Sequence, residues 1–166
     1  MSLETFVKRA KKEKAEVIQY RNKSGDIEHS KKQLIKLRKL YDGFLIVNDY
    51  IDLNIYCDGV HIGQEDLIRF GGSIDALKRE IGSDKLVGLS THNKEEIEKA
   101  NEMDLNYIGL GAYRETSTKS VGTVLGEQLF ELAKLSKHPV AAIGGLKLSD
   151  TIDTAYKVVG SDMYEH

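Results

Sequence analysis

Short runs of apolar residues recur along this chain, and stretches with helical spacing separate them. Each run is four or five residues long, largely continuous, and typical of a strand that is buried on both faces. The predicted strands are 16–20, 44–48, 59–62, 86–90, 107–111 and 140–144. Strands buried on both faces indicate a parallel sheet, because helical crossovers cover both of its sides.

Helices are predicted between those runs, at 27–41, 93–103, 123–136 and 150–158. Asn93 is a favoured N-cap, and Glu96 three residues later completes the pattern of a capping box. Ser149 is the predicted cap of the last helix. The alternation of strand and helix is compatible with two architectures, a (β/α) barrel and a doubly wound sheet.

The composition indicates one ordinary globular domain, residues 1–166. The net charge of −2 gives no support for a nucleic-acid partner, and no apolar run approaches the roughly 20 residues of a membrane span. The N-terminus is charged, with no apolar signal-peptide core. Cys57 is the only cysteine, so an internal disulfide is excluded and a reduced, cytoplasmic setting is predicted.

The carboxyl ends of the predicted strands carry the candidate site, because parallel α/β folds bind ligands at those ends. Cations and hydroxyls suited to phosphate oxygens follow several strands: Arg21, Lys23, Ser90, Thr116, Ser117, Thr118 and Lys119. Gly144-Gly145 opens a loop whose backbone N–H groups can approach an anion closely. The pattern predicts a ligand that carries phosphate.

Two aspartates, Asp49 and Asp66, follow neighbouring strands and are opposite in charge to these cations. In the stretch "DGVHIGQEDL", Glu65 and Asp66 come just after a buried run, where carboxylates are a poor choice for packing. Mg²⁺ is commonly held by one or two carboxylates together with substrate phosphates. We therefore expect Mg²⁺ and a substrate with more than one phosphate group.

Each of these residues also has a simpler interpretation. Asp49 could cap a helix at 50–56, since aspartate is a favoured N-cap, and Asp66 or Glu65 could cap the short turn at 65–70. His61 on an apolar strand is typical of a hydrogen-bonded core histidine. The joint placement of the polar residues at one end of one sheet favours the functional interpretation.

Six motifs occur in the order and kind seen in the thiamine phosphate synthase family, which this chain resembles closely. They are "IQYRNK", "IVNDYIDL", "DGVHIGQEDL", "VGLSTHN", "YIGLGAYRETSTK" and "VAAIGGL". The resemblance covers nearly the whole chain, from about Ala15 to Gly145. It implies a (β/α)8 TIM barrel and a transferase that joins a pyrimidine methyl diphosphate to a thiazole ethyl phosphate. The implied products are thiamine phosphate and pyrophosphate, and the implied cofactor is Mg²⁺.

The resemblance also implies roles for individual residues. Positions that match the pyrimidine diphosphate site are Gln19, Arg21, Lys23, Asn48, Ser90 and Lys119. Positions that match the thiazole phosphate site are Thr116, Ser117, Thr118 and Gly145. Asp49 and Asp66 match the metal-binding aspartates. Arg21, Lys23 and Lys119 would act in catalysis by neutralising charge on the departing pyrophosphate.

The sequence departs from the family pattern in one loop and at both ends. Ala112 and Glu115 stand where the family usually has prolines. The family barrel opens with an apolar strand and closes with another, whereas this chain starts at a helix and has at most a stub at Met163-Tyr164. The barrel is therefore predicted to lack its first strand and most of its eighth. Three explanations are open: a truncated chain, a homo-oligomer that fills the gap, or a degenerate homologue.

Two alternative functions are considered. A thiazole tautomerase of the same superfamily would transfer a proton with a histidine near the position of His92. The presence of Arg21, Lys23, Asp49 and Asp66 argues against it, because a tautomerase binds no diphosphate. The other alternative is a homologue that binds phosphate ligands without turnover.

Overall fold

The computed structural model describes residues 1–115 and 122–164. These residues fall into two compact units, Met1–Val87 and Gly88–His166. The predictions made for Thr116, Ser117, Thr118 and Lys119 lie outside the described residues.

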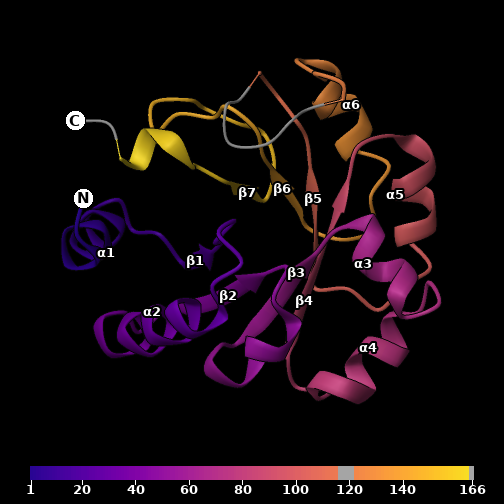
Figure 1. The fold of residues 1–166 in the computed structure, drawn as a ribbon. Coiled ribbons are helices and arrows are strands. Elements are labelled where there is room, and N and C mark those ends of the chain that lie inside the picture. The colour runs from indigo at the N-terminus through magenta and orange to yellow at the C-terminus, as the bar shows by residue number, and fades with distance from the viewer. Residues whose placement is uncertain (116–121, 165–166) are drawn as a thin grey trace. The chain divides into compact units, whose positions relative to one another are not determined.

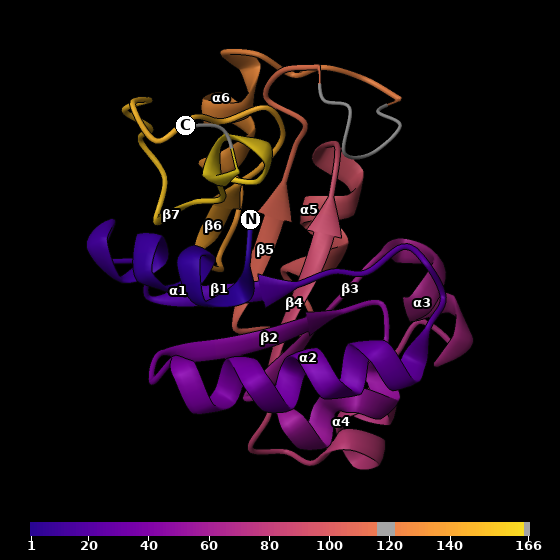
Figure 2. The same ribbon diagram turned by 60° about the vertical axis from the view of Figure 1, so that its left-hand side comes forward.

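The first unit alternates helices and strands (Figure 1, indigo to magenta). Its elements are α1 (Leu3–Lys12), β1 (Val17–Tyr20), α2 (Ile27–Leu40), β2 (Phe44–Asn48), the 3-10 helix η1 (Ile51–Tyr56), β3 (Gly59–Ile62), α3 (Gln64–Arg69) and α4 (Ile74–Ile81). Strands β1, β2 and β3 pair in parallel and in chain order. Helix α2 runs alongside β2 in Figure 2, and it buries Leu34 and Leu37 completely.

The second unit continues the same alternation. Strand β4 (Leu86–Thr91) begins in the first unit and runs into the second. The elements that follow are α5 (Lys94–Ala100), β5 (Tyr107–Leu110), α6 (Gln128–Ala133), β6 (Val140–Ala142), β7 (Tyr156–Lys157) and the 3-10 helix η2 (Ser161–Met163). Strands β4 to β7 pair in parallel and in chain order. Parallel pairing in both units confirms the predicted α/β class.

The apolar runs form the core because strands covered on both faces lose almost all contact with water. Leu45, Ile46 and Val47 of β2 are at most 1% exposed, and Ile108 and Leu110 of β5 are fully buried. Burial of one such side chain stabilises the fold by roughly 1.5–3 kcal/mol. All six predicted strands are present: 44–48 and 59–62 have the predicted bounds, and the other four differ by one or two residues at one end.

One helix start follows the predicted cap chemistry, that of α5. The Asn93 side chain accepts a hydrogen bond from the N–H of Glu96 at the start of α5. The Glu96 carboxylate accepts from the N–H of His92 at 2.8 Å, one residue before the position expected of a capping box. Helix α6, at Gln128–Ala133, is much shorter than the predicted 123–136.

The predicted helix at 150–158 is wrong. That segment contains strand β7, which pairs with β6, and the remainder has no regular structure. The Asp150 carboxylate accepts from the N–H of Lys147, and the Lys157 ammonium donates to two carbonyl oxygens, those of Leu148 and Asp150. Side chains therefore satisfy this backbone in place of a helical ladder.

The strand stub predicted at Met163-Tyr164 is also wrong. The structure has the 3-10 helix η2 at Ser161–Met163, and Met163 is buried. The strand that follows β6 lies earlier, at Tyr156–Lys157. In the part of the chain that the structure describes, no helix is long and apolar enough to cross a membrane.

Candidate functional site

The first unit brings a cation and a carboxylate together at the ends of β1 and β2. Arg21 follows β1, and its Nε lies 3.6 Å from Oδ2 of Asp49, which follows β2. Asp49 has a φ of 69°, in the left-handed region that few residues other than glycine adopt, although aspartate tolerates it better than most. Its N–H donates to the carbonyl of His61 in β3, at 3.2 Å. The Asp49 carboxylate therefore lies at the carboxyl end of the sheet.

The N-cap interpretation is wrong for Asp49, and Asp66 caps α3 from the third position of the helix rather than as its N-cap. The 3-10 helix η1 starts at Ile51, and its N-cap is Tyr50, with no side-chain hydrogen bond at the cap. Oδ2 of Asp66 accepts from the N–H of the N-cap residue Gly63 at 3.0 Å, which is the half of a capping box that a glycine N-cap allows. A carboxylate has about four lone-pair sites on two oxygens, so this contact does not preclude a metal bond.

The donor types of the first unit fit Mg²⁺. Magnesium prefers oxygen ligands and usually takes only one or two carboxylates, with phosphates and water completing its shell. Within residues 1–115 and 122–164 there is no cluster of three or more His, Cys, Asp or Glu side chains that could hold a metal. Two carboxylates, those of Asp49 and Asp66, are the number that a magnesium site completed by phosphate and water would use.

The other predicted residues of the first unit lie at the same strand ends. Gln19 is half-buried in β1, and Asn48 is the buried last residue of β2. Lys23 is exposed in the loop after β1. Asn22 orders that loop, because its amide donates to the Ser30 hydroxyl at 2.9 Å and its oxygen accepts from the N–H of Ser24 at 3.0 Å.

No role in the site is assigned to His61, Cys57 or His92. His61 is buried in β3. Cys57 is buried, and desolvation raises the pKa of its thiol to about 12, so the thiol is unreactive at neutral pH. His92 is an exposed loop residue, and its Nδ1 lies 2.9 Å from the Glu96 carboxylate.

A hollow of about 540 Å³ in the first unit lies at the opposite ends of the strands. Its lining includes Phe44, the first residue of β2, and residues that precede β2 or β3: Arg38, Tyr41, Gly43 and Asp58. Parallel α/β folds place their chemistry at carboxyl strand ends, so we do not assign the site to this hollow.

The second unit holds Ser90 and Gly145. Ser90 is half-buried in β4, and Gly144-Gly145 follows β6. The two glycines have φ values of 100° and 64°. A Cβ on Gly144 would meet Cβ of Ala112 at 2.5 Å, and one on Gly145 would meet the Glu115 carbonyl oxygen at 2.9 Å. Only glycine fits this turn, which lies directly against the segment before Thr116.

In the glycine turn, the carbonyl groups accept hydrogen bonds from described residues, but the N–H groups donate none to them. The carbonyl of Gly144 accepts from the N–H of Arg114 at 3.0 Å, and that of Gly145 accepts from Nη1 of Arg114 at 3.1 Å. The N–H groups of Gly144, Gly145 and Leu146 donate no hydrogen bond to any other residue that the structure describes. Successive N–H groups of this kind can form a concave anion site.

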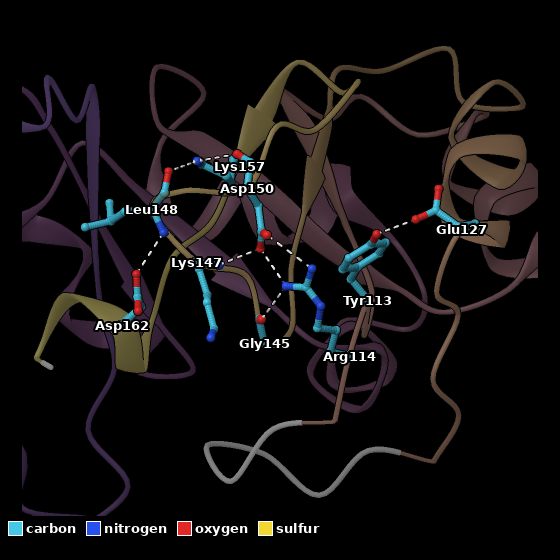
Figure 3. A network of polar contacts seen from close by, with 9 residues as sticks. All are labelled: Tyr113, Arg114, Glu127, Gly145, Lys147, Leu148, Asp150, Lys157 and Asp162. Atoms are coloured by element: carbon cyan, nitrogen blue, oxygen red, sulfur yellow. Dashed lines mark hydrogen bonds and ion pairs between the residues drawn. The ribbon is translucent and has the colours of Figure 1, made fainter.

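Arg114 belongs to a network that the sequence did not single out (Figure 3). Its guanidinium binds the Asp150 carboxylate through two hydrogen bonds, of 2.5 and 3.1 Å, and lies 4.8 Å from the ring centroid of Tyr113. The Arg114 guanidinium and the N–H of Lys147 lower the pKa of Asp150 to about 2. The sequence does carry one signal for this pair, since Arg114 comes just before the hydroxyl-rich stretch Thr116 to Thr118.

A family model described as thiamine monophosphate synthase matches residues 1–159. The chain is 39% identical to the thiamine-phosphate synthase of Persephonella marina, over 87% of this chain and 71% of that protein. It is 35% identical to the thiamine-phosphate synthase of Caldicellulosiruptor saccharolyticus, over 88% and 72%. Among solved structures, the thiamine phosphate pyrophosphorylase of Pyrococcus furiosus matches with a TM-score of 0.72 and 28% identity, over 88% of this chain and 70% of that one. The chain therefore belongs to the thiamine monophosphate synthase family.

Proposed function

We propose that this chain is a thiamine-phosphate synthase, a transferase that joins a pyrimidine methyl diphosphate to a thiazole ethyl phosphate and releases pyrophosphate. The names of its relatives support this function and do not favour the tautomerase or the non-catalytic alternative. The structural observation that carries it is the pairing of Arg21 with Asp49 at the carboxyl ends of neighbouring strands.

The residues of the first unit are assigned to the pyrimidine diphosphate. Gln19 and Asn48 hold it in place, and Arg21 and Lys23 neutralise its oxygens. Asp49 and Asp66 hold Mg²⁺, which supplies positive charge to the phosphate oxygens when it is bound. In this assignment the Asp49 carboxylate both pairs with Arg21 and binds the metal.

The residues of the second unit divide between the two substrates. Ser90 lies near the pyrimidine, and Lys119 binds the diphosphate. The thiazole phosphate is bound by Thr116, Ser117, Thr118 and Gly145. The N–H groups of the glycine turn are the described donors that support this assignment.

The proposed reaction is dissociative. The bond between the pyrimidine methylene and the diphosphate oxygen breaks, and its electron pair leaves with pyrophosphate. Arg21, Lys23 and Lys119 neutralise the charge that develops on this leaving group. The thiazole nitrogen then supplies the electron pair of the new bond. Such a reaction depends mainly on positioning and electrostatics, so it needs no strong general base.

The proposal extends to the fold and the setting implied by the resemblance. They are a single-domain (β/α)8-type barrel, small-molecule substrates and a cytoplasmic location. The parallel strands β1 to β3 and β4 to β7 support the barrel.

The experiment is incubation with both substrates, with and without Mg²⁺, and detection of thiamine phosphate by mass spectrometry. We expect product only with Mg²⁺. We also expect Asp49→Asn and Asp66→Asn each to lower turnover at least about 100-fold, the scale typical of lost electrostatic stabilisation at a reaction centre.

The matched control is Asp52→Asn. Asp52 is an exposed aspartate of η1 that has no assigned role, and its loss should leave turnover unchanged. If the Asp49→Asn and Asp66→Asn variants both kept wild-type turnover and metal dependence, the metal assignment would be wrong.

A further inference from the structure

We propose that Arg114 is a positioning residue for the thiazole phosphate, held in place by Asp150. This inference rests on the proposed function, because it explains how the chain shapes the glycine turn assigned to that phosphate. Neither residue was identified from the sequence as part of the site. Both lie in the second unit, among the residues drawn in Figure 3.

The first step concerns the direction of two peptide groups. Arg114 binds the carbonyl oxygen of Gly144 with its backbone N–H and that of Gly145 with its side chain. A trans peptide is planar, so its C=O and N–H point in opposite directions. The described cis peptide is Gly111–Ala112, elsewhere in the chain. By holding both carbonyls, Arg114 aims the N–H groups of Gly145 and Leu146 away from itself.

The second step concerns what fixes Arg114. Asp150 accepts two hydrogen bonds from the guanidinium, and the Tyr113 ring lies against its face. Asp150 is fixed in turn, because its carboxylate accepts from the N–H of Lys147 at 2.8 Å and its carbonyl accepts from the Lys157 ammonium at 2.7 Å. The contacts of Arg114 and Asp150 therefore join the segments that follow β5 and β6 to Lys157, the last residue of β7.

The third step distinguishes positioning from direct binding. The Asp150 side chain is 18% exposed and ionised at neutral pH, so it offsets the charge of Arg114. If Arg114 bound the phosphate itself, the Asp150 carboxylate would compete with the ligand for the guanidinium. If Arg114 only shapes the turn, the carboxylate helps binding by keeping the guanidinium in place. The two roles predict opposite effects of removing the Asp150 charge.

The test is calorimetric titration of thiazole ethyl phosphate into the wild-type chain and the variants. We expect Asp150→Asn to weaken binding at least about fivefold and Arg114→Ala at least about tenfold, the range expected when charge-assisted hydrogen bonds are lost. Arg114→Lys keeps the charge but lacks the planar fork, so its loss should be intermediate. The KM for the pyrimidine diphosphate should change by less than about twofold in all three variants.

The matched control is Glu131→Gln, which removes one carboxylate from an exposed ion pair with Lys134 in the same unit. It should bind thiazole ethyl phosphate as the wild type does. Tighter or unchanged binding by Asp150→Asn would overturn the positioning role.

A second readout does not depend on activity. In Arg114→Ala, hydrogen exchange should become faster at the N–H groups of residues 113 and 114, which donate to the carbonyls of Ile143 and Gly144. Unchanged exchange in this variant would overturn the inference. The same measurement on Arg114→Lys keeps the test valid if the alanine variant does not fold.

Failure of this inference can be told apart from failure of the proposed function. A wild type that binds thiazole ethyl phosphate but makes no thiamine phosphate contradicts the function and leaves the binding test intact. A wild type that makes thiamine phosphate, alongside an Asp150→Asn variant with normal binding, contradicts only the positioning role. A wild type that does not bind this ligand overturns both.

Discussion

Two arginine–aspartate pairs in this chain bind backbone carbonyl oxygens, at opposite kinds of strand end. In the first unit, Arg38 contacts the Asp58 carboxylate at 2.7 Å and donates to the carbonyls of Tyr41 and Gly43. The same oxygen of Asp58 accepts from the N–H of Leu45 at 2.7 Å. These residues surround the amino ends of β2 and β3. This pair joins a helix end to the strands that follow it.

The pair in the second unit uses the same groups at carboxyl strand ends. Arg114 binds Asp150 and the carbonyl of Gly145, in a turn whose N–H groups make no bond within the described residues. The two pairs have the same chemistry, but they bind different backbone segments. Arg38 binds the carbonyls of a helix-to-strand connection, whereas Arg114 binds those of the glycine turn assigned to the phosphate. The Arg38 pair should therefore affect stability, and the Arg114 pair should affect stability and ligand binding together.

The largest expected effect on stability comes from Arg38→Ala. The variant loses three charge-assisted hydrogen bonds of a half-exposed side chain, so unfolding should become easier by about 2–3 kcal/mol. Urea denaturation measures this change. Lys39→Ala, an exposed neighbour on the same helix, is the control and should change stability by less than about 0.5 kcal/mol. Equal losses in the two variants would show that the Arg38 pair contributes nothing.

The next effect is that of Gly145→Ala. Alanine at a φ of 64° is strained, and its Cβ would lie 2.8 Å from Cβ of Arg114, so the expected loss is about 1–2 kcal/mol. Gly122→Ala is the control, because the φ of Gly122 is not in the left-handed region and a Cβ there would meet nothing within 4 Å. If both variants unfolded at the same urea concentration, the turn would not be constrained as described.

The pH dependence sharpens the comparison further. The pKa of Asp150 is lowered from 3.8 to about 2, so its contribution to stability is present above pH 3.8 and is lost as the pH falls toward 2. The stability difference between wild type and Asp150→Asn should therefore shrink between about pH 4 and pH 2. Thermal unfolding across that range measures it. A difference that stays constant would mean that Asp150 is not paired in solution.

The smallest expected effect is that of Glu102→Gln. Glu102 pairs with Lys137 at 3.3 Å, and both side chains are at least two-thirds exposed. Screened pairs of this kind contribute about 0–1 kcal/mol. The Arg38 pair is expected to have a larger effect because Arg38 also binds backbone carbonyls. If Glu102→Gln lowered the free energy of unfolding as much as Arg38→Ala does, this explanation would be wrong.

The sequence predicted the strands well because its apolar runs are continuous and buried on both faces. The same signal drew attention to Asn48, which ends such a run, and to Asp49 and Arg21, which directly follow one. The cap of α5 at Asn93 was predicted because N-cap chemistry is local in sequence. The features that the sequence predicted correctly are those that depend on residues only a few positions away.

The segment after β6 could not be predicted for the opposite reason. Its helical pattern at 150–158 competes with contacts from Arg114, which lies 36 residues away from Asp150 in the chain. The sequence also left open whether Asp49 and Asp66 act as helix caps or as site residues, because both roles use the same carboxylate. Long-range side-chain partners decide these cases.

The most direct test of the comparison is the affinity for thiazole ethyl phosphate of Arg114→Ala and Arg38→Ala, measured at a temperature where both variants are folded. The account predicts a loss of at least about tenfold for Arg114→Ala and less than about twofold for Arg38→Ala, although the latter is expected to lose more stability. Equal losses of affinity would contradict it, because binding would then follow general stability and not the shape of the glycine turn.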